Sequence, residues 1–313
     1  MLLRQSLPSA TEAKRFTSLE QVNKLMAVKI IEFLGMNANE INSSDPRLAN
    51  KLCPYINKTC KKIDRYGQQK PMCVVESKGG LPLIVCEHRL LSTDMENPTS
   101  YQRSRLLEIS KVVFEDGIAA QDIEYKYEVT TKLRQRADFI LRDKRNGDAC
   151  ILEIQGGGET SSTKILSDHI TRWENGENVR LDDFPFRVTK TGKKATPGLI
   201  PANAWRRLQE QLIVKGGICI SSEKKFVAAM GKTIYLHLLG KLPLVENLKR
   251  QKSGAWNCAF ISYKITEGVT IDFEIDLDNI LYLDLKELIN RLIEYGEKDE
   301  ELFTTNMIPL EES

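Results

Sequence analysis

Three polar side chains on two strand-like segments could hold a divalent metal ion against a phosphate. Asp138 lies in the first segment, and Glu153 and Gln155 lie in the second. The Asn146-Gly147 pair between them is the strongest short-range signal for a β-hairpin, because a type I′ turn needs positive φ at both central residues. With this turn, Asp138 pairs with Gln155, and all three polar side chains lie on one face of the hairpin. Two carboxylates and an amide gathered at one point suit a hard divalent cation such as Mg²⁺.

Residues next to this hairpin could extend the site. Glu128, near the end of the preceding strand-like segment, could supply a third carboxylate. Arg134 and Arg136 follow it, and a guanidinium group suits a phosphate. Each of these residues alone is more often ordinary surface, and the Glu153–Gln155 segment could equally be the solvent face of an amphipathic strand.

Four of the seven cysteines fall in a short segment that is rich in proline and glycine: Cys53, Cys60, Cys73 and Cys86. In a reducing compartment such clustering indicates a metal site more often than disulfides. Four thiolates suit tetrahedral zinc or iron and leave no open coordination position, so a structural role is expected. The alternatives are four unrelated cysteines, two disulfides, or His88 in place of one thiolate. The remaining cysteines are expected to be buried apolar residues: Cys150, Cys219 and Cys258.

The charge of the chain is unevenly distributed. The net charge of +2 does not by itself indicate nucleic acid, but residues 186–207 contain six basic residues and no acidic one. Further basic clusters lie at 51–70 and 249–252. Solvated surface is the ordinary explanation of one cluster, whereas two long acid-poor stretches favour a phosphate-facing groove. The candidate DNA contacts are Arg134, Arg136, Lys190, Lys193, Lys194, Arg206 and Arg207.

Length and hydrophobic periodicity predict an α/β (α+β) fold, with a mixed central sheet flanked by helices and a small four-cysteine metal module near the N-terminus. Helices are expected at 17–35, 99–116, 161–174, 202–214, 223–239 and 285–295. Strands are expected at 122–130, 136–142, 149–155, 217–221 and two or three times within 256–284, with a loop at 186–201. The expected division is an N-terminal helical segment (1–40), the four-cysteine module (41–95), a core with DNA-recognition elements (96–300) and an acidic tail (301–313).

Nothing in the sequence predicts a membrane protein. No run of about 18 apolar residues occurs, so no transmembrane helix is expected. The first residues lack the sustained apolar stretch of a signal peptide, so a cytoplasmic location is the expectation.

The cysteine segment and the hairpin together resemble the NotI-type rare-cutting type II restriction endonucleases. The resemblance rests on Cys53-Pro54-Tyr55, Cys60-Lys61-Lys62, Cys73-Val74-Val75, Leu83-Ile84-Val85-Cys86, Asp138 and Leu152-Glu153-Ile154-Gln155. It is weak around residues 203–212 and absent in the last hundred residues.

This resemblance implies a restriction-endonuclease-like nuclease core of the PD-(D/E)xK superfamily, with Gln155 in place of the usual lysine. It implies catalytic Mg²⁺ held by Asp138 and Glu153, and iron, with zinc as the alternative, on the four cysteines. Carrying the family's upstream glutamate over to Glu128 is less direct, because Glu128 is closer to Asp138 here. The expected activity is cleavage of double-stranded DNA at a palindrome by a homodimer, since two active sites related by a two-fold axis match two strands related in the same way.

Two other functions are compatible with the same residues. One is an iron–sulfur repair or CRISPR-adaptation nuclease acting on DNA ends, although such nucleases usually carry cysteines on both sides of the core. The other is a catalytically inactive, metal-stapled DNA-binding protein in which Gln155 marks a lost active site.

Overall fold

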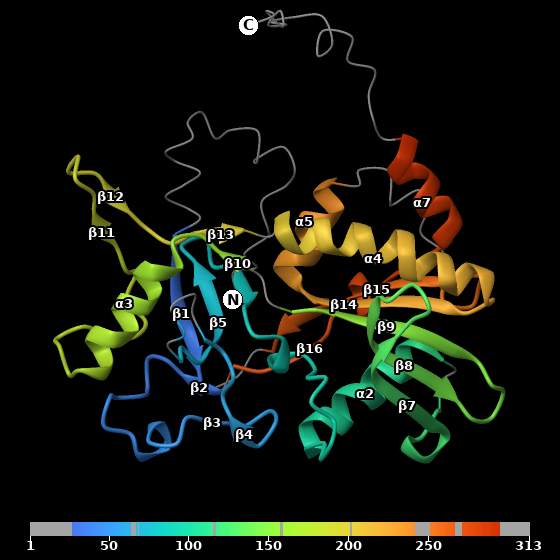
Figure 1. The fold of residues 1–313 in the computed structure, drawn as a ribbon, viewed down its shortest axis with the longest axis horizontal. Helices are drawn as coiled ribbons and strands as arrows, with labels where there is room; N and C mark the ends of the chain where they lie inside the picture. Colours follow the sequence, from blue (N-terminus) through green and yellow to red (C-terminus); the bar gives the residue numbers. More distant parts are fainter. Residues whose placement is uncertain are drawn as a thin grey trace, which may run out of the picture.

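The computed structural model describes residues 27–63, 67, 69–114, 117–156, 159–200, 202–241, 251–266 and 271–294. The fold is mixed α/β, with a central mixed sheet flanked by helices, as expected (Figure 1). Two larger sheets, with helices packed on them, contain most of the strands of the part of the chain described.

The central seven-stranded sheet combines an antiparallel meander with parallel strands. The meander consists of β7 (Ile123–Thr130), β8 (Arg136–Asp143) and β9 (Ala149–Gln155). β14 (Lys225–Gly231) runs parallel to β9, and β15 (Cys258–Ile265) runs parallel to β14. β16 (Phe273–Ile275) and β17 (Leu281–Leu283) pair antiparallel with β15. β14 and β15 are almost continuously apolar because helices cover both faces of the parallel strands.

Helices pack on both faces of this sheet. In Figure 1, α4 (Ala202–Ser221), α5 (Lys232–Lys241) and α7 (Leu285–Glu294) lie above the sheet, and α2 (Ser100–Val113) lies below it. α4 contacts both β9 and β14, which places one of its faces over the end of β9. Within the described ranges, no helix is both long and apolar enough to cross a membrane.

A second, four-stranded sheet carries two of the four clustered cysteines at or beside its strands. Its order is β2-β1-β5-β6, from β1 (Val28–Phe33), β2 (Met36–Asn37), β5 (Met72–Ser77) and β6 (Pro82–Ile84). α3 (Thr163–Glu174) packs on this sheet, with the rings of Phe33 and Trp173 5.6 Å apart. At the edge facing the central sheet, Gly231 of β14 packs against Ile84 of β6.

The remaining strands are short and lie in hairpin-like pairs. They are β3 (Leu52–Cys53) with β4 (Lys58–Thr59), β10 (Glu159–Thr160) with β13 (Leu199–Ile200), and β11 (Arg187–Val188) with β12 (Lys194–Ala195). The loop predicted over 186–201 therefore contains one small hairpin and one strand that pairs with β10.

The helix predicted over 17–35 is wrong for residues 28–33, which form β1; residues 17–26 lie outside the described ranges. Val28 and Ile30 are fully buried, whereas Lys29 and Ile31 are less so, and β1 pairs with β5. This alternation has the period of a strand. A short apolar run fits a helix or a strand from sequence alone, and here the pairing with β5, far along the chain, selects the strand.

The strand predicted at 217–221 is also wrong, and the helix predicted at 223–239 is wrong for residues 225–231 and confirmed for 232–239. α4 continues through Ser221, β14 occupies 225–231, and α5 begins only at Lys232. Gly216 is retained inside α4 because α7 crosses there, and a Cβ at this position would lie 3.3 Å from the Leu285 side chain. The helices expected at 99–116, 161–174, 202–214 and 285–295, and the strands expected at 122–130, 136–142, 149–155 and within 256–284, are confirmed within a few residues.

Candidate active site

The β8–β9 hairpin brings Asp138 and Glu153 together, in a register that differs from the predicted one. Phe139 pairs with Leu152, and four residues, 144–147, connect the strands. Gly147 has φ of +77°, whereas Asn146 is not in the left-handed region, so the predicted type I′ turn is wrong. The longer loop moves each partner by two residues, which preserves the face because side chains alternate with a period of two.

In this register Asp138 lies opposite Glu153 instead of Gln155, and the predicted shared face is retained. Two side chains take over the hydrogen bonds where the regular ladder ends. The Asp138 N–H donates to Glu153 Oε1 at 3.4 Å, and the Ile154 N–H donates to Asp138 Oδ2 at 2.8 Å. Both carboxylates are therefore held in place by backbone groups of the opposite strand.

Helix α4 supplies two further residues that the sequence analysis missed. Gln211 Nε2 donates to Glu153 Oε2 at 2.7 Å, and Lys215 Nζ lies 2.7 Å from the same oxygen. Gln155 Nε2 donates in turn to the side-chain oxygen of Gln211. Glu153 is fully buried, and only 3% of Lys215 and 4% of Gln155 are exposed. A buried acid, a buried lysine and two amides thus form one connected network.

The electrostatics of the acidic pair favour a bound cation. Burial, and secondly the charge of Asp138, raises the pKa of Glu153 to about 7, while Lys215 acts in the opposite direction. Burial also raises the pKa of Asp138, against the lowering effects of the Ile154 N–H and Lys215. Two neighbouring carboxylates held in a desolvated place are hard to ionise together without added positive charge. A divalent cation supplies that charge.

Two more carboxylates lie near Asp138. Glu128 is opposite Asp138 in the β7–β8 register, with φ of +52°, and its carboxylate pairs with Arg136 and accepts a bond from Thr93 Oγ1 at 3.2 Å. Its charge contributes to raising the pKa of Asp138. The predicted proximity of Glu128 to the acidic pair is consistent with this arrangement, whereas the guanidinium of Arg136 is engaged by Glu128.

Glu87 is the second carboxylate, and the sequence analysis did not identify it. It follows Cys86 directly, and its charge also raises the pKa of Asp138. Gly156, the residue after β9, allows the two segments to approach: a Cβ at Gly156 would lie 2.6 Å from the Glu87 Cα. The end of the cysteine segment thus packs against the end of the β8–β9 hairpin.

The four clustered cysteines are buried and are not joined in disulfides. Burial raises the pKa of each thiol, and neighbouring thiols raise it further at Cys53, Cys73 and Cys86. Backbone N–H groups act in the opposite direction at every sulfur, donated by Tyr55 and Ile56 to Cys53, Lys62 to Cys60, Gly35 to Cys73 and His88 to Cys86. Such bonds favour the thiolate, which is the form that binds a metal.

Neither the carboxylates around Asp138 nor the four clustered cysteines form a complete set of metal ligands. Within the described ranges, no three Asp, Glu, His or Cys side chains lie close enough together to hold an ion. The thiols at 53, 60, 73 and 86 fit a soft metal by their chemistry, burial and amide donors. The other three cysteines are buried in the core, as predicted.

The candidate DNA contacts lie in three separate groups. Arg134 and Arg136 are exposed at the turn between β7 and β8. Lys190, Lys193 and Lys194 are exposed on the β11–β12 hairpin, which projects from the opposite side of the molecule in Figure 1. Arg206 and Arg207 are exposed on α4, about one turn before Gln211. Only the arginines at 134 and 136 and those at 206 and 207 therefore lie on or next to elements that carry the acidic pair or its partners.

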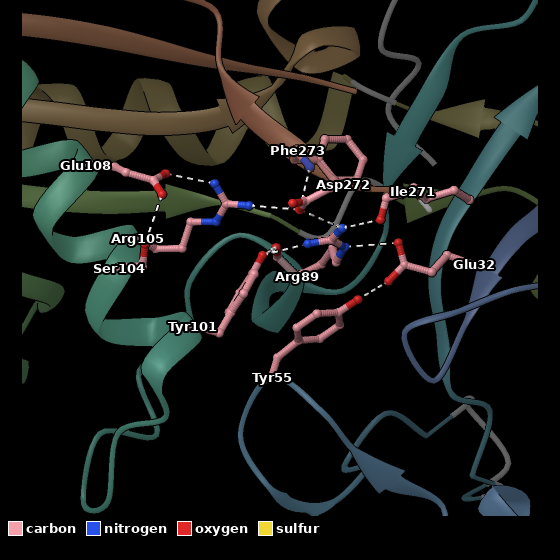
Figure 2. Close-up of polar contacts among 10 residues, drawn as sticks. All are labelled: Glu32, Tyr55, Arg89, Tyr101, Ser104, Arg105, Glu108, Ile271, Asp272 and Phe273. Atoms are coloured by element: carbon pink, nitrogen blue, oxygen red, sulfur yellow. Dashed lines mark hydrogen bonds and ion pairs between the residues drawn. The ribbon is translucent and has the colours of Figure 1, made fainter. Parts of the chain in front are cut away.

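A buried polar network attaches the cysteine segment to the central sheet (Figure 2). Arg89 lies at its centre: its guanidinium donates to Glu32 Oε2 at 2.9 Å, to Tyr101 Oη at 2.6 Å and to the Ile271 carbonyl at 2.8 Å. Tyr55 donates to the other oxygen of Glu32. Asp272 lies 3.4 Å from Arg89 and 3.2 Å from Arg105 of α2.

The raised pKa of Glu153 predicts a pH-dependent stability in the absence of added divalent cations. Because the folded state binds this proton more tightly than the unfolded state, the contribution is present below the unfolded pKa of about 4.5 and is lost as pH rises through about 7. The loss amounts to roughly 3 kcal/mol. Urea unfolding between pH 4.5 and 8 should show it, and Glu153→Gln should remove most of the slope. An exposed control, Glu124→Gln, should keep the slope, and a flat wild-type profile would contradict this assignment.

The comparisons with known proteins do not identify this arrangement. No family model matches the chain, and no curated protein matches it.

Proposed function

We propose that the chain is a divalent-metal-dependent endonuclease that hydrolyses phosphodiester bonds of duplex DNA at a palindromic site, in the manner of a type II restriction endonuclease. The observation that carries the proposal is the pair of the half-buried Asp138 and the fully buried Glu153, with pKa values raised and a lysine and two amides on its inner side. Holding such a pair costs stability, so a structural purpose alone does not account for it.

The donor set fits magnesium. Mg²⁺ usually takes one or two protein carboxylates together with waters and substrate phosphate oxygens, and Asp138 and Glu153 offer two. When bound, this ion would activate a water and offset the charge that develops on the phosphate.

The protein's own residues would orient that chemistry. The Ile154 N–H fixes the Asp138 carboxylate, and Gln211 and Lys215 fix that of Glu153. Gln155 uses its amide N–H on Gln211, so its direct partner is a protein group and not a water.

We further propose that the four clustered cysteines hold a structural metal, iron by resemblance and zinc by chemistry. Their buried sulfurs and the amide donors around them support it. All four precede the β8–β9 hairpin, which favours this assignment over the nucleases whose cluster cysteines lie on both sides of the core. Elemental analysis of the purified protein decides between the two metals.

The duplex and the second copy of the chain are the proposed partners. The exposed Arg134, Arg206 and Arg207, on or next to the elements that carry the acidic pair and its partners, would contact phosphates and position the DNA. A homodimer would place one acidic pair at each strand of a palindrome.

The test is digestion of a long, sequenced duplex with the purified protein and Mg²⁺, followed by mapping of the ends. Discrete fragments with a common end sequence are the expected result, and a parallel reaction in which Ca²⁺ replaces Mg²⁺ serves as the control for binding without cleavage. Intact DNA with folded, metal-loaded protein would reject the proposed activity. Salt-dependent binding without cleavage would then favour the inactive DNA-binding protein.

A further inference from the structure

Position 155 brings no positive charge to the acidic site. Gln155 can donate hydrogen bonds, but an amide cannot offset the negative charge that two carboxylates and a phosphate concentrate there. A cation on the same face of the sheet would have to come from another element.

Lys215 is such a cation. It extends from α4 to Glu153 Oε2, 2.7 Å away, and both side chains are shielded from solvent. Gln211, one turn earlier on α4, bonds to the same oxygen and links it to Gln155. The amide of Gln211 and the ammonium of Lys215, both from α4, therefore converge on one carboxylate oxygen, and Gln155 of β9 is linked to it through Gln211.

The burial of Lys215 calls for a specific reason. The other buried side chains of α4 are apolar: Ala204, Trp205, Leu208, Leu212 and Cys219. A leucine or methionine at 215 would continue this stripe, and replacing a buried ion pair by apolar residues is often neutral or stabilising. The position is thus suited to a charge that the site uses.

We propose that Lys215 is a positioning residue of the nuclease site, and that it supplies from α4 the positive charge that a lysine at position 155 would supply from β9. This inference rests on the proposed function. Lys215 and Gln211 hold Oε2 of Glu153 on the helix side, which leaves the carboxylate oriented alongside Asp138. Gln155 holds Gln211 and so completes the positioning network.

The test moves the charge instead of only deleting it. Lys215→Met should lower the cleavage rate constant by about 100-fold or more, the usual cost of losing one preorganised charged group. Lys215→Arg should retain more activity than Lys215→Met. Adding Gln155→Lys to Lys215→Met returns an ammonium to the same face, and cleavage should recover at least tenfold over Lys215→Met.

A second readout needs neither DNA nor metal. The melting temperature without divalent cations should fall in Lys215→Met, because Glu153 is left buried without its partner, and should rise again in the Gln155→Lys, Lys215→Met double variant. Lys70→Met is the matched control: Lys70 is also a buried lysine, bonded to Thr171 Oγ1 at 2.8 Å with Glu174 nearby, but it lies in the four-stranded sheet region. Lys70→Met should therefore lower the melting temperature. At a temperature where the variant is folded, it should not show the large loss of cleavage rate that is expected for Lys215→Met.

The outcomes separate this inference from the proposed function. Loss of cleavage in Lys215→Met with recovery in the double variant supports it. Wild-type cleavage by folded Lys215→Met, or a double variant that regains its melting temperature but not its cleavage, overturns it. If the wild-type protein cuts no DNA, the proposed function fails. In that case the melting temperature still tests whether a lysine at position 155 can replace Lys215. A double variant that melts at the temperature of Lys215→Met would overturn this replacement.

Discussion

Asp138→Asn is expected to abolish DNA cleavage, by about 1,000-fold or more, while the protein stays folded and binds DNA. Asparagine keeps the size of the side chain and an oxygen that can accept the Ile154 N–H bond at 2.8 Å. It removes the charge on which a divalent cation depends. It also removes the repulsion that raises the pKa of Glu153, so the folded state should not be weakened.

The measurement is a single-turnover cleavage assay with Mg²⁺, beside a binding assay with Ca²⁺ on the same duplex. Glu124→Gln is the matched control, because Glu124 is an exposed carboxylate of β7 that pairs with Arg142 outside the site. It should cleave at the wild-type rate. Cleavage by Asp138→Asn within tenfold of wild type would show that Asp138 does not hold the catalytic cation.

The face of the β8–β9 hairpin could be predicted from sequence because strand side chains alternate with an invariant period of two. The register could not. An Asn-Gly pair favours a two-residue turn, but here a four-residue loop, closed by the bond from the Asp143 N–H to the Asp148 carbonyl, is adopted. The error of two residues left the grouping of Asp138 and Glu153 intact, whereas an error of one would have moved Glu153 to the other face.

The contribution of α4 was hidden because it is a long-range contact. Gln211 and Lys215 are 58 and 62 residues beyond Glu153 in the chain, and their role depends on how α4 crosses β9. One signal was available: Lys215 falls on the apolar stripe of the helix, in line with Leu208, Leu212 and Cys219. A charged residue in such a stripe needs a buried partner, and Glu153 is one.

The errors at β1 and β14 have the same origin. Both segments are short apolar runs that fit a helix or a strand equally well from sequence. β1 is decided by its pairing with β5, and β14 by its position between β9 and β15. The sheet, and not the local sequence, selects the conformation.

Arg89→Met is expected to lower the free energy of unfolding by about 3–5 kcal/mol, the cost of breaking a buried ion pair by removing one partner. Arg89 is 2% exposed and Glu32 is 1% exposed, so the variant would strand a buried carboxylate. Burial raises the pKa of Glu32, and Arg89 acts in the opposite direction, which is consistent with this dependence. The bonds from Arg89 to Tyr101 and to the Ile271 carbonyl would be lost as well.

Urea unfolding measures this effect, and two further variants interpret it. Arg47→Met removes an arginine whose carboxylate partner, Asp45, lies in an exposed turn, and should leave the free energy of unfolding close to that of the wild type. Adding Glu32→Gln to Arg89→Met removes the stranded charge and should restore part of the loss. Equal stabilities for the single and double variants would show that the cost lies in packing and not in the unpaired carboxylate.

Arg89→Met should also lower the cleavage rate, because Arg89 lies where the cysteine segment meets the acidic pair. Arg89 is three residues after Cys86, and Glu87, between them, contacts Gly156 at the exit of β9. Without the Arg89 bonds, the short helical turn Glu87–Arg89 would be held less firmly against the end of the β8–β9 hairpin. Cleavage by Arg89→Met should therefore fall at temperatures where the protein is still folded. Adding Glu32→Gln should restore stability more fully than cleavage, since the double variant still lacks the bonds from the Arg89 side chain to Tyr101 and to the Ile271 carbonyl.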